Sequence, residues 1–195
     1  MGAIYDFERE KLIIGVIYHE KEILDKVLEI LVREFGEIEA ASEEFSFSNE
    51  FSTYYDNEIG GEGLRGIYSF KETIDPTRQA DIKSLTNRIE AEFSIEGKRK
   101  INLDPGFINH GRLLLATTKE TGFRIPLKDG IYTELTLYWA RGKWQKLPWT
   151  YRDYQSERVQ KFITEVRRSY LAERKKIQAE NIKKTMMKRN FCRKK

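Results

Sequence analysis

The sequence predicts an α+β fold with a ferredoxin-like split βαβ core, extended by an antiparallel β-meander and a C-terminal helix. The first half of the chain orders its segments as strand, helix, strand, strand, helix, strand, which is the order of a split βαβ unit. Short strand-like runs joined by tight turns follow between residues 113 and 147. From Ser156 onward apolar residues recur at helical spacing, which predicts a last amphipathic helix. We expect the helices to cover one face of the sheet.

The first strand and helix have clear boundaries. Residues 11–18, KLIIGVIY, form a short apolar run with β-branched side chains that is typical of a buried strand. A helix ended by Gly36 is predicted next, because apolar residues recur every three or four positions at Ile23, Leu24, Val27, Leu28, Leu31 and Phe35. Residues 38–47 then look extended.

A second strand and helix follow a glycine-rich loop. Residues 64–74 can form the strand, and Asp75 and Pro76 suit the N-cap and the first position of the helix. Its buried stripe is Ile82, Leu85, Ile89 and Phe93, and Gly97 can end it. Residues 99–103 then form the next strand.

The second half of the chain is predicted to be mostly strands, at 113–119, 122–127, 131–139 and 143–147. Residues 131–139 alternate between two faces. Asp129 and Gly130 are typical of a type I′ turn, and Arg141 with Gly142 supplies a second tight turn.

The composition limits the class of protein. A chain of 195 residues can bury roughly 70% of its unfolded surface, so it can form a core without disulfides or a structural metal. The single cysteine, Cys192, allows no internal disulfide and no cysteine-based metal site. No apolar run approaches the roughly 20 residues of a membrane span, and the first ten residues lack the apolar region of a signal peptide. We therefore expect a cytoplasmic protein without membrane contact, with one domain over residues 1–171.

Charge is distributed unevenly along the chain. Residues 151–195 hold 15 basic and 5 acidic residues, whereas the remaining residues hold 20 basic and 26 acidic. The last segment, residues 172–195, carries 10 basic and 2 acidic residues, and we call it the basic tail. Such a tail could bind nucleic acid through phosphate contacts, or it could be a frayed, solvated helix.

Motifs of nucleotide-binding loops and of hydrolase elbows are absent from the sequence. The two histidines, His19 and His110, lie far apart in sequence, so no metal site is predicted and no cofactor is indicated.

The segment that most strongly suggests a binding site is residues 102–107. We expect Pro105 and Gly106 to turn the chain directly after a strand, which would present the carboxylate of Asp104 at the strand end. Asp104 could instead cap its own turn.

A second candidate cluster follows the next strand. Thr117, Thr118, Lys119 and Arg124 combine two hydroxyls with two cations, which suits recognition of a phosphate or a carboxylate. The two cations could instead pair with neighbouring acidic residues. Several aromatic residues could stack on bases or belong to the core, namely Phe45, Phe47, Phe51, Tyr54, Tyr55, Trp144, Trp149, Tyr151 and Tyr154.

Several segments resemble a known prokaryotic family, domain-of-unknown-function family forty-four-sixteen. They are KLIIGVIY, SFKETIDP, INLDPGFI and LLLATTKETGFRIPLKDGIYTELTLYWARGKWQKLPWTYRDY, within about residues 10–170. The resemblance implies a single-domain cytosolic protein and brings no activity with it. In that family a histidine usually precedes the arginine that corresponds to Arg124, whereas this chain has Phe123. If that histidine were a catalytic acid or base, this chain would have lost it.

Three hypotheses of function follow. The first is a binding module for an anionic ligand, a nucleotide or an RNA phosphate, with Lys119 and Arg124 at the anion and Thr117 and Thr118 as hydroxyl donors. The second is an enzyme that acts on a phosphorylated small molecule, with Asp104 as base or Mg²⁺ ligand. The third is a structural or assembly partner. The scarcity of histidines for proton transfer favours the first hypothesis.

Overall fold

The computed structural model describes the backbone of residues 2 and 4–192, and the side chains of these residues up to 179. Its helices are α1 (Lys21–Phe35), α2 (Phe47–Glu50), α3 (Asp56–Ile59), α4 (Gln79–Glu92) and α5 (Glu157–Cys192), with 3₁₀ turns η1 (Pro76–Arg78) and η2 (Asp153–Gln155). In this part of the chain no helix is both long and apolar enough to cross a bilayer.

A nine-stranded antiparallel sheet forms the centre of the molecule. Its strands are β1 (Glu10–Tyr18), β2 (Ile38–Ala41), β3 (Phe45–Ser46), β4 (Leu64–Ile74), β7 (Ile101–Ile108), β8 (Arg112–Thr117), β9 (Ile125–Lys128), β10 (Ile131–Ala140) and β11 (Lys143–Lys146). They lie in the order β11-β10-β8-β7-β1-β4-β2, with β3 beside β4 and β9 beside β10. A small hairpin of β5 (Ser94–Ile95) and β6 (Lys98–Arg99) follows α4. The α+β class predicted from the sequence is confirmed.

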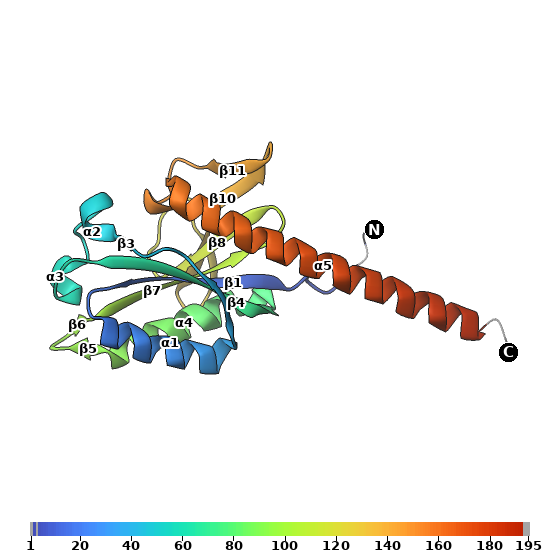
Figure 1. Ribbon diagram of the computed structural model, residues 1–195, viewed down its shortest axis with the longest axis horizontal. Coiled ribbons are helices and arrows are strands. Elements are labelled where there is room, and N and C mark those ends of the chain that lie inside the picture. The colour runs from blue at the N-terminus through green and yellow to red at the C-terminus, as the bar shows by residue number, and fades with distance from the viewer. Residues whose placement is uncertain (1, 3, 193–195) are drawn as a thin grey trace.

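The helices α1 and α4 cover one face of the sheet (Figure 1). Alternate residues of β1, among them Leu12, Ile14 and Val16, pack there against the apolar side of α1. The stop signal of α1 and the start signal of α4 are confirmed, but the expectation that Gly97 ends α4 is wrong, because α4 ends at Glu92 and Gly97 lies in the turn between β5 and β6. Asp75 accepts a hydrogen bond from the backbone N–H of Thr77 before α4, and Gly36 ends α1 at φ 87°.

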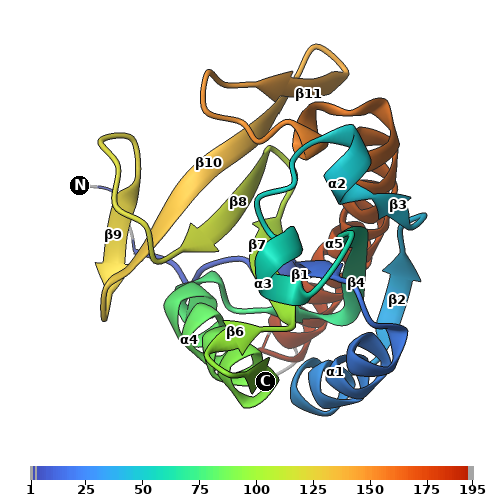
Figure 2. The ribbon, with the colours of Figure 1, turned by 90° about the vertical axis from the view of Figure 1, so that its left-hand side faces the viewer.

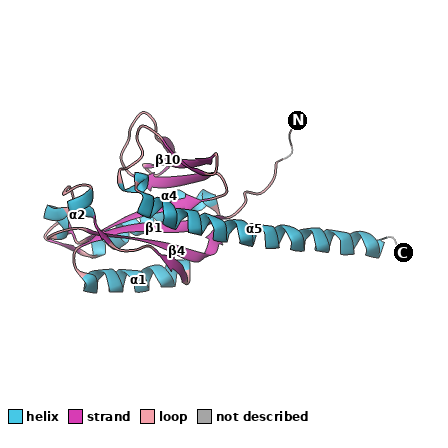
Figure 3. Ribbon diagram, turned by 45° about the horizontal axis from the view of Figure 1, so that its top comes forward, coloured by secondary structure: helices cyan, strands magenta, loops and turns pink. Residues whose placement is uncertain are grey.

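The helix α5 covers the opposite face, so the expectation that helices cover one face is wrong (Figure 1). Ile13 of β1 and Ile67 of β4, whose side chains point to this face, pack against the apolar residues Val159, Phe162, Ile163 and Val166 of α5. Both faces of β1 are apolar and buried, which requires a layer on each side. Figure 3 shows that α5 also projects beyond the sheet. The basic tail therefore continues α5, and its side chains at Ile182, Met186 and Cys192 lie outside the described residues.

The predicted tight turns occur, but the strands do not form a simple meander. Asp129 and Gly130 have φ of 54° and 73°, and Arg141 and Gly142 have 54° and 76°, so both hairpins have the left-handed turns expected. However, β8 pairs with β10 rather than with β9, as Figure 2 shows. The ten residues of β10 are long enough for β9 and β11 to share its other edge.

The segment 101–108 is one continuous strand, so the expected turn at Pro105 and Gly106 is wrong. All of β7 pairs with β1, from Ile101 beside Tyr18 to Ile108 beside Lys11. Asp104 therefore lies in mid-strand, opposite Gly15. Pairing with β1, which is distant in sequence, keeps Pro105 extended. The proline does not interrupt this pairing, because the edge of β7 on which it lacks an N–H group faces away from β1.

Candidate functional site

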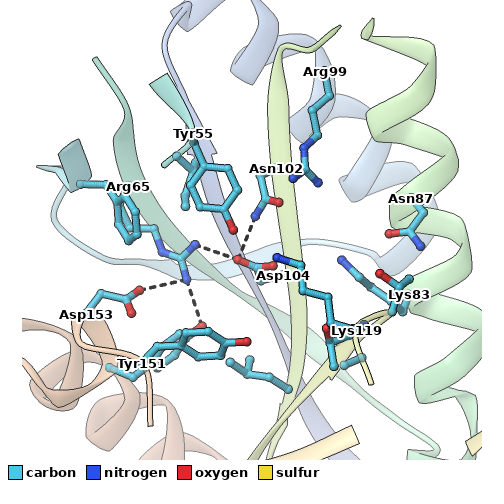
Figure 4. Close-up of a pocket in the computed structure, with 17 residues that line it drawn as sticks. Tyr55, Arg65, Lys83, Asn87, Arg99, Asn102, Asp104, Lys119, Tyr151 and Asp153 are labelled. Atoms are coloured by element: carbon cyan, nitrogen blue, oxygen red, sulfur yellow. Dashed lines mark hydrogen bonds and ion pairs between the residues drawn. The ribbon is translucent and has the colours of Figure 1, made fainter. Parts of the chain in front are cut away.

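The candidate site is a cleft that opens where β7 and β8 separate. The two strands pair only from Gly106 to Ile108, whereas β7 continues along β1 to Ile101. Figure 4 shows the polar side chains that turn into this cleft. It is lined by Tyr55, Arg65, Lys83, Asn87, Arg99, Asn102, Asp104, Thr117, Thr118, Lys119, Tyr151, Asp153 and Tyr154, together with a few apolar residues.

The edge of β7 that faces the cleft can remain unpaired for two reasons, namely the missing N–H group of Pro105 and two side chains of α4 that bind the backbone of Leu103. The backbone of Leu103 points away from β1, and by alternation that of Pro105 does too, so Pro105 offers β8 no N–H group. Leu103 is satisfied from α4 instead. Its N–H donates to Oε1 of Glu90 at 2.7 Å, and its carbonyl accepts from Nζ of Lys83 at 2.7 Å. The open edge therefore carries no orphaned group at Leu103.

The floor of the cleft is an ion-pair cluster around Arg65. Its guanidinium lies 3.1 Å from the carboxylate of Asp104 and 3.2 Å from that of Asp153, and its side chain is only 2% exposed. The group fits because residue 15 is glycine, since a Cβ there would lie 2.6 Å from Nη2 of Arg65. The cluster joins β4 and β7 to η2, which precedes α5.

The two carboxylates differ in their protonation chemistry. Burial would raise the pKa of the Asp104 carboxyl, but the Arg65 and Lys83 cations hold it below its usual value. At Asp153 burial outweighs the attraction of Arg65, so the pKa of that carboxyl is raised. Asp104 retains 29% exposure and also accepts from the amide of Asn102 at 2.9 Å. It is thus an ionised acceptor at the cleft wall.

Lys119 is the cation at the mouth of the cleft. It is exposed, and within the described part of the chain it makes no salt bridge. Its Nζ lies 5.1 Å from the ring centre of Tyr54, and its backbone N–H donates to the hydroxyl of Thr117 at 3.2 Å. Lys119, Thr117 and Thr118 thus all line the cleft.

Arg124 lies behind the cleft rather than in its lining. Its guanidinium donates to Glu134 at 2.7 Å, to the backbone carbonyl of Lys119 at 2.7 Å and to the hydroxyl of Tyr151 at 2.9 Å. Its side chain is only 7% exposed. Arg124 thus orients two residues that line the cleft. Burial, together with the nearby Glu134, raises the pKa of Tyr151 to about 12, so that phenol is neutral.

Of the predicted site residues, the structure brings Asp104, Thr117, Thr118 and Lys119 together and leaves Arg124 behind them. Sequence analysis missed Arg65, Lys83, Asn87, Arg99, Asn102 and Asp153. A signal existed for Arg65, a charged residue two positions before Ile67 and on the same buried face of β4. Gly15 in the middle of a buried strand was a second signal, because such a glycine marks a close approach.

Two other predictions concern metals and the tail. Among the described residues no group of three or more histidine, cysteine, aspartate or glutamate side chains is placed to hold a metal ion. The basic tail beyond residue 179 lies outside the described side chains, so its predicted contact with nucleic acid stays a prediction.

A family model described as Domain of unknown function (DUF4416) matches residues 8–170. The chain belongs to this family. The DUF4416 match contains every residue that lines the cleft and ends within α5, before the basic tail. No curated protein and no solved structure matches the chain.

Proposed function

We propose that this DUF4416 protein is a binding module for an anionic ligand, and that the cleft takes the phosphate of a nucleotide or of RNA. The observation that carries the proposal is Lys119, an exposed cation without a salt bridge among the described residues, which lines the same cleft as Thr117 and Thr118. Ammonium and hydroxyl donors that converge on one point suit phosphate oxygens.

The other cations of the cleft already have partners, which leaves Lys119 as the anion-binding group. Arg65 is occupied by Asp104 and Asp153. Lys83 and Arg99 share Glu90, at 3.9 and 2.8 Å. These groups raise the potential around the anion without losing their own contacts. Asp104 and the amides of Asn87 and Asn102 supply acceptors and donors for hydroxyl groups of the ligand.

The test is the binding of phosphate compounds by the wild-type protein and by Lys119→Ala. Isothermal titration with inorganic phosphate, pyrophosphate, AMP, ATP and a short single-stranded RNA should give binding for at least one of them. Loss of one charged contact of about 1.4 kcal/mol should weaken that binding about tenfold in Lys119→Ala. Lys143→Ala is the matched control, since Lys143 is exposed on β11. Absence of binding by every compound would refute the proposal and favour an assembly role.

The second candidate function is an enzyme that acts on a phosphorylated small molecule. The observation that favours it is the ionised carboxylate of Asp104 in the cleft wall. Because a lowered pKa makes a carboxylate a weak base, Asp104 suits a Mg²⁺ ligand better than a proton acceptor. Release of inorganic phosphate from phosphate esters with Mg²⁺, abolished in Asp104→Asn, would establish this function over simple binding.

We also propose that β1, α1, β2, β4, α4 and β7 form a ferredoxin-like split βαβ core. The antiparallel order β7-β1-β4-β2 and the position of α1 and α4 on one face support it. An experimental structure superposed on ferredoxin-like domains tests this proposal.

A further inference from the structure

We propose that the cleft continues into an aromatic subsite that takes the planar base of a mononucleotide while its phosphate lies at Lys119. The aromatic subsite is defined by Phe47, Phe51, Tyr54, Tyr55 and Tyr151. The inference rests on the proposed function and names the class of ligand.

The aromatic subsite adjoins the cleft. The hollow that its rings line shares Phe47, Tyr55, Lys119, Tyr151 and Asp153 with the cleft, so the two lie side by side along these residues. Lys119 stands at the junction, with hydroxyls and amides on one side and aromatic rings on the other. A ligand bound at Lys119 through an anionic group can therefore place a second, planar group on the rings.

The rings are fixed and partly uncovered, as a stacking platform requires. Tyr54 is 64% exposed, although its edge contact with Tyr55, at 4.9 Å between ring centres, holds it in place. Tyr55 in turn packs against Phe47 at 5.9 Å, and Phe51 packs against the buried Phe45 at 5.7 Å. A row of rings anchored in the core at one end offers an apolar face to a base.

Charge beyond the aromatic subsite favours a mononucleotide over RNA. Glu50 directly precedes Phe51 and lines a third hollow, whose charged residues are Glu43, Glu50, Glu157, Glu165, Arg158 and Lys161. Carboxylates outnumber cations there, and Arg158 is already paired with Glu50 at 3.0 Å. A polynucleotide backbone that continued past the rings would meet this acidic surface, whereas a single nucleotide ends before it.

The test compares nucleoside monophosphates with ribose 5-phosphate, which has the same phosphate and sugar but no base. Isothermal titration of the wild-type protein should show at least one of AMP, GMP, CMP and UMP binding about tenfold tighter than ribose 5-phosphate. Tyr54→Ala should weaken nucleotide binding more than ribose 5-phosphate binding and so reduce this difference, because it removes a stacking ring as well as the ring that contacts the ammonium of Lys119. Tyr138→Ala, on the exposed side of β10 and 39% exposed, is the matched control and should retain the difference.

Three outcomes would overturn the inference. If wild type binds ribose 5-phosphate as tightly as every nucleotide, and Lys119→Ala weakens both, the cleft binds phosphate and the aromatic subsite is not used. If a short single-stranded RNA binds more than tenfold tighter than any monophosphate, the ligand is RNA. If no phosphate compound binds, the proposed function fails as well.

Discussion

Arg65 reaches Asp104 from beneath the cleft, at 3.1 Å and with only 2% of its own side chain exposed. The contact joins the two strands on either side of β1, since Arg65 lies on β4 and Asp104 lies on β7. Between them stands Gly15, the residue of β1 that leaves room for the guanidinium. The charge of Asp104, and with it the polarity of the cleft wall, thus depends on a residue that is almost fully buried.

Gly15→Ala should displace Arg65 and destabilise the protein. The new Cβ would lie 2.6 Å from Nη2 of Arg65, whose position is fixed by two carboxylates. Overpacking of this kind costs about 1–3 kcal/mol. Urea unfolding should show that loss of stability. Isothermal titration should show weaker binding of the phosphate compound that the wild-type protein binds. Gly111→Ala is the control, because a Cβ there meets no atom within 4 Å. Equal stability of the two variants would contradict the role given to Gly15.

Arg65→Met should destabilise the protein more at neutral than at acidic pH. Without the cation, Asp104 and Asp153 are buried carboxyls with raised pKa values, which cost stability above those pKa values and regain it as they protonate. Removing one partner of a buried ion pair costs about 3–5 kcal/mol. We therefore expect the deficit, measured by urea unfolding, to be largest at pH 7.5 and to shrink towards pH 4.5.

Arg33→Met is the control for this pH series, because Arg33 is exposed and its side chain is 72% accessible. Its stability should follow that of the wild type at each pH. A deficit in Arg65→Met that stays constant, or grows on acidification, would show that the two carboxylates do not depend on Arg65.

Local patterns predicted the elements of the fold well. The apolar stripe ending at Phe35, the Asp75 cap and the turn at Asp129 each depend on neighbours in sequence, and each occurs where it was expected. Pro105 was misread because its context is long-range, since pairing with β1 keeps it extended. The side of the sheet that α5 covers also depends on contacts that sequence spacing does not encode.

The candidate site was predictable only in part. Thr117, Thr118 and Lys119 are adjacent in sequence, so their joint chemistry could be recognised. Arg65, Lys83 and Arg99 come from separate elements and converge only because β7 and β8 separate. Arg124 has the chemistry of an anion ligand, but its burial beside Glu134 places it behind the cleft.

Lys83 and Glu90 should be coupled through the backbone of Leu103. Each provides one hydrogen bond to that residue at 2.7 Å, and they lie 3.9 Å apart. Lys83→Met and Glu90→Gln should each cost about 1–3 kcal/mol, because each weakens or removes a charged contact in a buried place. A double-mutant cycle by urea unfolding should give a coupling of about 0.5–3 kcal/mol. Strictly additive effects would contradict a shared role at the open edge.

Near its middle, α5 still contacts the rest of the protein through Glu173 and Arg174. Lys11 is buried, with 1% of its side chain exposed, and its Nζ lies 3.0 Å from Glu39 and 3.2 Å from Glu173. Arg174 also pairs with Glu8 at 2.8 Å. Deleting the whole basic tail, residues 172–195, would remove both of these contacts from α5. Deleting residues 180–195 would keep them.

Deletion of residues 180–195 should therefore cost about 1 kcal/mol or less, as for changes away from a core. Deletion of residues 172–195 should cost about 1–3 kcal/mol more, because the ammonium of Lys11 loses one of its two carboxylates. Glu173→Gln in the full chain should reproduce part of that difference. If the basic tail binds polyanions, deletion of residues 172–195 should abolish the salt-dependent part of that binding, and deletion of residues 180–195 should reduce it, because Arg174, Lys175 and Lys176 remain. Equal stability of the two deletions would show that Glu173 contributes nothing to the anchoring of α5.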